Sequence, residues 1–173
     1  NQMVQDQNHT APPEFHEVLA KAGAAIEAMN FERFEAEIAE AERLSPGHPE
    51  IPHFKGLAFF EKKKTVRAFE LVAQAAYAMP ENPFVRHNLA AIQISLGKFD
   101  DAEINLRNAI KMLPEYAEAF HTLAGIRKFE REDPLIQQME GLARNTKFNA
   151  KNASFLCFAL AKAYDDSGRH RQA

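Results

Sequence analysis

The stretch VRHNLAAIQISLGKFDDAEINLRNAIKMLP, residues 85–114, decides the fold of this chain. Its first half carries apolar residues at helical spacing, and Gly97 ends that helix because glycine readily takes the left-handed conformation. In the second half the apolar residues recur on one helical face from Ala102 onward. Pro114 stops the second helix because proline has no N–H to donate and clashes with the preceding turn. The stretch therefore predicts two helices joined by a tight turn.

The same pattern repeats along the chain with a fixed period. Pro46, Pro80 and Pro114 are each 34 residues apart, and Ala68 and Ala102 share that spacing. A period of this length, with proline at one end and small residues at fixed internal places, is the signature of a helix–turn–helix solenoid. We therefore predict an all-α fold, a right-handed superhelical solenoid of antiparallel helix pairs.

The unit at 83–116 resembles the tetratricopeptide repeat (TPR). The positions that carry the resemblance are Leu89, Ala90, Gly97, Phe99, Ala102, Ala109 and Pro114. The unit departs from the repeat pattern at Arg86 and Gln93, where Trp and Tyr are usual, and at Leu106, where an aromatic is usual. The resemblance implies that the first helices of successive repeats line a concave groove.

About four and a half repeats account for most of the sequence. We expect a flexible leader at 1–14 and a TPR solenoid at 15–173, with repeats at 15–48, 49–82, 83–116 and 117–153 and a partial repeat at 154–173. The repeat at 49–82 has Lys62, Lys63 and Lys64 where a turn glycine is expected. Because the sequence stops at the start of a second helix, we expect the parent protein to be longer.

Residues 131–173 resemble a narrower group. The strings EDPLIQQMEGLARN and FLCFALAKAYDDSGRHRQA are similar to the unit that precedes the catalytic domain in bacterial TPR–sulfotransferase fusion proteins. The resemblance implies a recruiting arm and no catalytic part, because none of the seven glycines forms a phosphate-binding cluster. An arm of a longer two-domain sulfotransferase is thus the alternative to a stand-alone scaffold.

Composition narrows the classes of function. With 21 basic and 24 acidic residues the net charge is -3, and no clustered basic face indicates nucleic-acid binding. No apolar run is long enough to cross a membrane, no signal core is visible, and the lone Cys157 suits a reducing compartment, so we expect a cytoplasmic location. We expect Cys157 to be a packed thiol, and we expect no catalytic residue, cofactor or metal in this chain.

Three histidines follow the repeat period. His53, His87 and His121 are 34 residues apart and occupy one position of three successive repeats, which by the TPR resemblance faces the groove. Packed helices lie roughly 8–10 Å apart, so three such rings cannot all reach one zinc ion at about 2 Å. Two interpretations stay open: the rings hydrogen-bond along the inner helices, or they form part of a ligand surface.

The expected function is protein–protein interaction through the concave groove. The residues predicted to bind a protein or peptide partner there are His53, Leu57, Phe60, Phe84, His87, Asn88, Ala91, Ile94, His121, Thr122 and Lys128. If the histidines charge on mild acidification, an acidic peptide should bind more tightly at about pH 5.5 than at about pH 8. The unfinished last repeat leaves an apolar face through which a homodimer is also expected.

Overall fold

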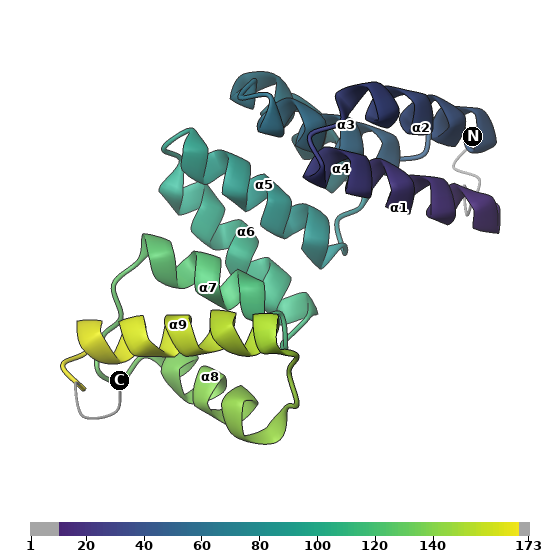
Figure 1. Ribbon diagram of the computed structural model, residues 1–173. Coiled ribbons are helices and arrows are strands. Elements are labelled where there is room, and N and C mark those ends of the chain that lie inside the picture. The colour runs from purple at the N-terminus through teal and green to yellow at the C-terminus, as the bar shows by residue number, and fades with distance from the viewer. Residues whose placement is uncertain (1–10, 170–173) are drawn as a thin grey trace, which may run out of the picture. The chain divides into compact units, whose positions relative to one another are not determined.

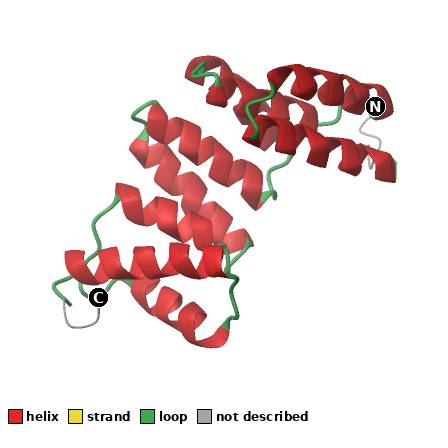
Figure 2. Cartoon of the chain, in the orientation of Figure 1, coloured by secondary structure: helices red, strands yellow, loops and turns green. Residues whose placement is uncertain are grey.

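All the regular secondary structure in the described part of the chain is helical. The computed structural model describes residues 11–169, and within this range it contains nine α-helices and no strand; Figure 1 labels the helices and Figure 2 shows the loops between them. The helices are α1 (Pro13–Glu27), α2 (Phe31–Leu44), α3 (Glu50–Glu61), α4 (Thr65–Ala78), α5 (Pro83–Ser95), α6 (Phe99–Met112), α7 (Ala117–Ile126), α8 (Pro134–Asn145) and α9 (Ala150–Asp166). The all-α prediction is confirmed.

The helices fall into two compact units, residues 1–79 and 80–173. The first unit holds α1 to α4 and the second holds α5 to α9. The sequence had indicated one continuous solenoid over 15–173. Helix α1 begins at Pro13, within the stretch expected to be a flexible leader, while residues 1–10 lie outside the described part of the chain.

The first unit consists of two helix pairs, α1 with α2 and α3 with α4. Phe15 of α1 and Phe34 of α2 are almost fully buried in the core of the first pair. In the second pair Gly56 allows a close approach, because a Cβ there would come within 2.5 Å of the Val72 side chain and 3.2 Å of the Ala68 carbonyl oxygen. This is the physical reason for a small residue at that repeat position.

The turns inside the helix pairs share one left-handed residue. Met29, Lys63 and Gly97 have φ values of 56°, 61° and 74° and stand at the same place in three consecutive turns. Lys63 thus adopts the conformation that glycine adopts in the third turn, although a left-handed residue with a Cβ costs roughly 1–2 kcal/mol. The run of lysines that replaces the turn glycine changes the strain of the turn and leaves its geometry intact.

The second helix of each of these pairs ends two residues before a proline. Helix α6 ends at Met112, and Leu113, which precedes Pro114, has φ −131° and ψ 86°. The proline ring disfavours helical backbone in the residue before it, which forces the chain out of the helix. The 34-residue spacing of prolines therefore sets where the repeats end.

In the second unit, α5 and α6 form a pair that contains a buried polar network. Arg86 donates from Nη1 to Asn105 Oδ1 at 3.0 Å, and Asn105 donates from Nδ2 to Gln93 Oε1 at 2.8 Å. Asn105 and Gln93 are both buried. Arg86 and Gln93 are two of the three departures from the TPR pattern, and Asn105 bonds to both of them. Hydrogen bonds here replace the aromatic packing that Trp and Tyr would supply.

The helices after α6 do not continue the simple pairing. The repeat at 117–153 was expected to form a fourth pair of neighbouring helices, but α7 packs mainly against α9, and α8 also packs on α9. Figure 1 shows α9 crossing beside α7 and α8. Leu156, Ala159 and Ala163 of α9 are buried in the same core as Phe120 and Leu123 of α7. Helix α9 thus completes the core of this unit.

Side chains of α9 and the α7–α8 loop hold that loop in place. Lys162 donates to the Arg127 carbonyl oxygen at 2.8 Å and to Asp166 Oδ2 at 2.6 Å, and the Phe129 N–H donates to the same Asp166 oxygen at 3.3 Å. Arg127 forms an ion pair with the buried Asp133, whose side chain also caps α8. The seven-residue loop is therefore ordered by bonds to distant residues.

Candidate partner-binding surface

The three periodic histidines have different surroundings. His53, on α3 in the first unit, is only 5% exposed, and its Nδ1 lies 2.8 Å from Glu50 Oε2. His87, on α5 in the second unit, is only 7% exposed. His121, on α7, is half-buried. Of the two interpretations left open by the sequence, the burial and hydrogen-bond contacts of His53 and His87 favour the hydrogen-bonding one at these two positions.

The hydrogen bonds around His87 assign the role of its Nε2 atom. The Thr122 hydroxyl donates to the Glu118 carbonyl oxygen at 3.0 Å, so Thr122 Oγ1 must accept the hydrogen of His87 Nε2, which lies 2.9 Å away. Burial lowers the pKa of His87, and the Glu118 carboxylate opposes that shift. The expected positive charge on mild acidification is therefore disfavoured at His87.

Aromatic rings of the second unit form two groups of contacts, one between α5 and the residue before α7 and one between α7 and α9. The Phe84 and Tyr116 rings are 5.3 Å apart, and Tyr116 also contacts His87 at 5.2 Å. His121 contacts Phe155 at 5.1 Å and Phe158 at 5.9 Å. We define the aromatic surface as Phe84, Tyr116, His121, Phe155 and Phe158.

This aromatic surface is accessible although it is apolar. Phe84 is 53% exposed and Phe158 is 68% exposed, while Tyr116 and Phe155 are half-buried. Burial, and next the Glu118 carboxylate, raise the pKa of Tyr116, so its hydroxyl stays neutral and can donate a hydrogen bond. Exposed aromatic rings with a polar handle are typical of residues that dominate binding to protein partners.

The other predicted groove residues lie around these rings or in the first unit. Leu57 and Phe60 are half-buried on α3 of the first unit. The members on the second unit are Asn88, Ala91 and Ile94 of α5, Thr122 of α7, and Lys128 in the loop that follows it. Ile94 packs against the core and Lys128 is exposed. Among the predicted residues, the structure brings His87 and Thr122 into direct contact and links Phe84 to His87 through Tyr116, whereas His121 contacts Phe155 and Phe158.

Sequence reasoning missed Tyr116, Phe155 and Phe158. Tyr116 directly precedes α7 and lies just outside the first-helix positions that the repeat pattern marks. Phe155 and Phe158 belong to α9, where Cys157 was expected to be a packed thiol; Cys157 is instead exposed. The repeat register could have found both phenylalanines, because they fall at the places that Phe84 and His87 occupy in their own repeat.

Within residues 11–169, no group of three or more His, Cys, Asp or Glu side chains is arranged to hold a metal ion. None of the helices in the described range is both long enough and apolar enough to traverse a bilayer.

Comparison with known proteins identifies the fold. No protein-family model matches the chain, and no curated protein matches it. Among solved structures, a mutant O-GlcNAc transferase of Thermobaculum terrenum matches at TM-score 0.60 and 17% identity, over 93% of this chain and 28% of the transferase. PilF of Pseudomonas aeruginosa matches at TM-score 0.60 and 16% identity, over 91% of this chain and 72% of PilF.

A third solved structure names the repeat. A tetratricopeptide repeat protein from Parabacteroides merdae matches at TM-score 0.59 and 17% identity, over 92% of this chain and 64% of that protein. At such low identities the likeness shows the fold, and that fold is the tetratricopeptide repeat solenoid. The chain spans little more than a quarter of the transferase that it resembles.

Proposed function

We propose that this chain is a protein-interaction scaffold whose aromatic surface binds a segment of a protein partner. The observation that carries the proposal is the exposure of Phe84 and Phe158, each of which belongs to a group of contacting rings in the second unit. Apolar side chains left in water gain free energy when a partner covers them, and aromatic residues recur among the residues that contribute most to binding. On this proposal the chain performs no reaction itself.

The chemistry of the aromatic surface indicates which kind of partner segment would bind to it. Phe84, Tyr116, Phe155 and Phe158 offer ring faces and edges, and Asn88 and the Tyr116 hydroxyl offer polar groups between them. An extended or helical segment with apolar anchors suits such a lining. His53 and His87 are buried, so neither ring is open to the acidic partner considered from the sequence.

A paired-variant experiment tests this proposal. Peptides selected from a displayed random library against the wild-type chain would be measured against the double variant Phe84→Ser, Phe158→Ser. The matched control, Val66→Ser with Ile104→Ser, removes two side chains of similar exposure, 66% and 59%, from the second helices of their pairs. We expect the first variant to weaken binding about tenfold or more and the control to leave it within about twofold. Equal losses in both variants would contradict the proposal.

The alternative, a recruiting arm of a longer two-domain sulfotransferase, also stays a proposal. It rests on the resemblance of residues 131–173, and a solved transferase of another kind, an O-GlcNAc transferase, is similar to this chain over 28% of its own length. Any sequence that follows Ala173 in the full-length protein tests it. A strand–loop–helix with a phosphate-binding glycine cluster there would support it, and further repeats would count against it.

Self-association through α9 is a third proposal. Phe158 and Cys157 are both exposed on this helix. Deletion of residues 154–173 would be a poor test, because Leu156, Ala159 and Ala163 belong to the core. Light scattering of wild type and Phe158→Ser over a concentration series is the better one. A dimer that persists unchanged in the variant would reject this interface.

A further inference from the structure

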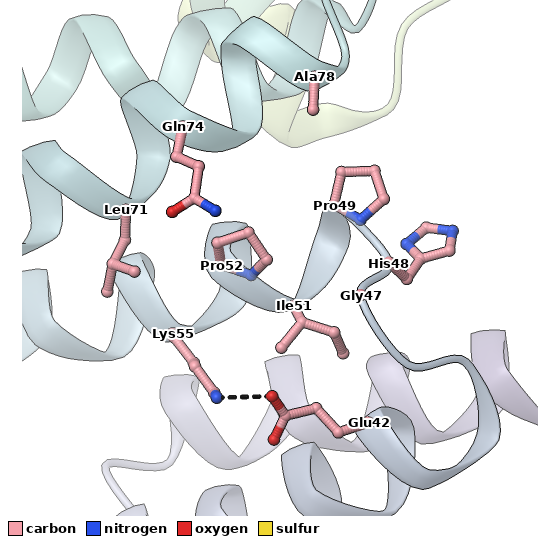
Figure 3. A pocket seen from close by; sticks show the side chains of 10 residues that line it. All are labelled: Glu42, Gly47, His48, Pro49, Ile51, Pro52, Lys55, Leu71, Gln74 and Ala78. Atoms are coloured by element: carbon pink, nitrogen blue, oxygen red, sulfur yellow. Dashed lines mark hydrogen bonds and ion pairs between the residues drawn. The ribbon is translucent and has the colours of Figure 1, made fainter. Parts of the chain in front are cut away.

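The first unit contains a cavity on helices other than those of the aromatic surface. It lies among α2, the turn before α3, α3 and α4, and has a volume of about 550 Å³ (Figure 3). Its lining is Glu42, Gly47, His48, Pro49, Ile51, Pro52, Lys55, Leu71, Gln74 and Ala78. Ligand pockets in proteins commonly measure roughly 300–1,000 Å³, so the cavity is large enough for a small ligand group.

One part of the lining is aliphatic. Figure 3 shows the rings of Pro49 and Pro52 on α3 and the turn before it, across from Leu71 and Ala78 of α4. Ile51 and Leu71 are anchored in the core, with exposures of 4% and 9%. This wall carries no aromatic ring and no charge, and it suits a branched aliphatic side chain.

The polar part of the lining has no net charge. Lys55 of α3 donates to Glu42 Oε1 of α2 at 2.9 Å, so the positive and the negative charge of the lining are paired with each other. His48 Nδ1 accepts the Glu50 N–H at 3.1 Å. A charged ligand would find no free counter-charge here and would lose its hydration, which is costly.

Gln74 supplies the directional polar group. Its side chain projects from α4 toward Pro52 and the Lys55–Glu42 pair (Figure 3). The amide is exposed and forms no hydrogen bond with any part of the chain that the structure describes. A primary amide offers donors and an acceptor side by side, the complement of a peptide group.

We propose that this cavity binds an aliphatic residue in an extended segment of a protein partner, and that Gln74 pairs with a peptide group beside that residue. The aliphatic wall of Leu71, Pro49 and Pro52 takes the side chain. The neutral lining selects an uncharged residue, and the amide fixes the backbone direction. The site is independent of the aromatic surface, so the chain has two places at which partner segments bind.

Short peptides provide the probe. The acetylated and amidated tripeptide with a central leucine would be titrated into the full chain labelled with ¹⁵N, beside analogues with central aspartate or lysine. We expect the leucine peptide to shift the amide signals of residues lining the cavity, and to bind several-fold more tightly than either charged analogue. Equal or tighter binding of a charged analogue would overturn the proposal.

Variants test where the peptide binds. Ala78→Trp fills the cavity from an exposed position, and Ala36→Trp adds the same side chain at an exposed position of α2 outside the lining. We expect Ala78→Trp to abolish the shifts and Ala36→Trp to keep them. Gln74→Leu should weaken binding several-fold with the fold intact, and binding unchanged by both lining variants would reject the site. The Phe84→Ser, Phe158→Ser protein should bind the peptide like wild type, which separates this site from the aromatic surface.

Discussion

Two connections in the second unit differ in length, and the helices that they join differ in their packing partners. Helices α5 and α6 are joined by a three-residue turn with a left-handed Gly97, and they pack on each other. Helices α7 and α8 are joined by the seven-residue loop 127–133, and α7 packs mainly on α9. A short turn makes sequence neighbours into packing neighbours. A longer loop lets a later helix take that place, provided that side chains fix the loop.

The largest difference in stability is expected between substitutions of two phenylalanines, one in the long loop and one at the first residue after the short turn. Phe129 of the long loop is 3% exposed, whereas Phe99, directly after the short turn, is 51% exposed. We expect Phe129→Ala to lower the free energy of unfolding by about 3–5 kcal/mol, because a buried ring is lost. Phe99→Ala should cost within about 0.5 kcal/mol. Urea denaturation measures both.

If Phe129→Ala does not fold, Phe129→Leu provides a milder version of the same change. Its expected cost is about 1–1.5 kcal/mol, and Phe99→Leu should again be nearly neutral. Similar costs at the two positions would show that the loop does not depend on the buried ring for its conformation.

A second contrast concerns how closely paired helices approach. A Cβ at Gly56 would meet the Val72 side chain at 2.5 Å, whereas one at Gly141 of α8 would meet nothing within 4 Å. We expect Gly56→Ala to destabilise by about 1–3 kcal/mol through overpacking. Gly141→Ala should stabilise by up to about 1 kcal/mol, because alanine favours the helix. Thermal unfolding of the two variants gives the signs, and a stabilising Gly56→Ala would contradict the close approach.

Adding a Cβ to the left-handed residue of one turn and removing it from another should change the stability in opposite directions. Gly97→Ala places a Cβ on a left-handed residue and should cost about 1–2 kcal/mol. Lys63→Gly removes that strain from the equivalent turn of the first unit and should gain up to about 1 kcal/mol. Denaturation midpoints test the pair, and a loss in both variants would mean that glycine entropy outweighs the strain at Lys63.

The smallest effect expected is a pH dependence that involves His87. Burial lowers its pKa below the ordinary value of 6.5 and Glu118 opposes this, so the unfolded chain binds the proton more readily than the folded one. The stabilisation is complete above pH 6.5 and is lost as pH falls from there through the folded-state pKa. His87→Gln should remove this part of the slope of unfolding free energy against pH. An unchanged slope between about pH 7.5 and 5 would assign it to other groups.

How far the sequence predicted the structure depends on the range of the interactions. The short turns and the ends of α2, α4 and α6 follow from prolines and turn residues within a few positions, and the all-α class was predicted correctly. The departures Arg86 and Gln93 were identified from the sequence, but the Asn105 that joins them lies on another helix and was not. For the candidate site, Phe84 and His121 were predicted, whereas Phe155 and Phe158 were missed.

The sequence by itself determined the 34-residue period, the helices and the turns between them, because each depends on backbone preferences of adjacent residues. Only the tertiary structure decided that α9 packs on α7, that the rings of His53 and His87 are buried, and that rings from α5, α7 and α9 form one surface. Those features depend on packing between residues far apart in the chain. A repeat pattern assigns equivalent positions, but the neighbours that fill the space around each position determine whether it is buried or exposed.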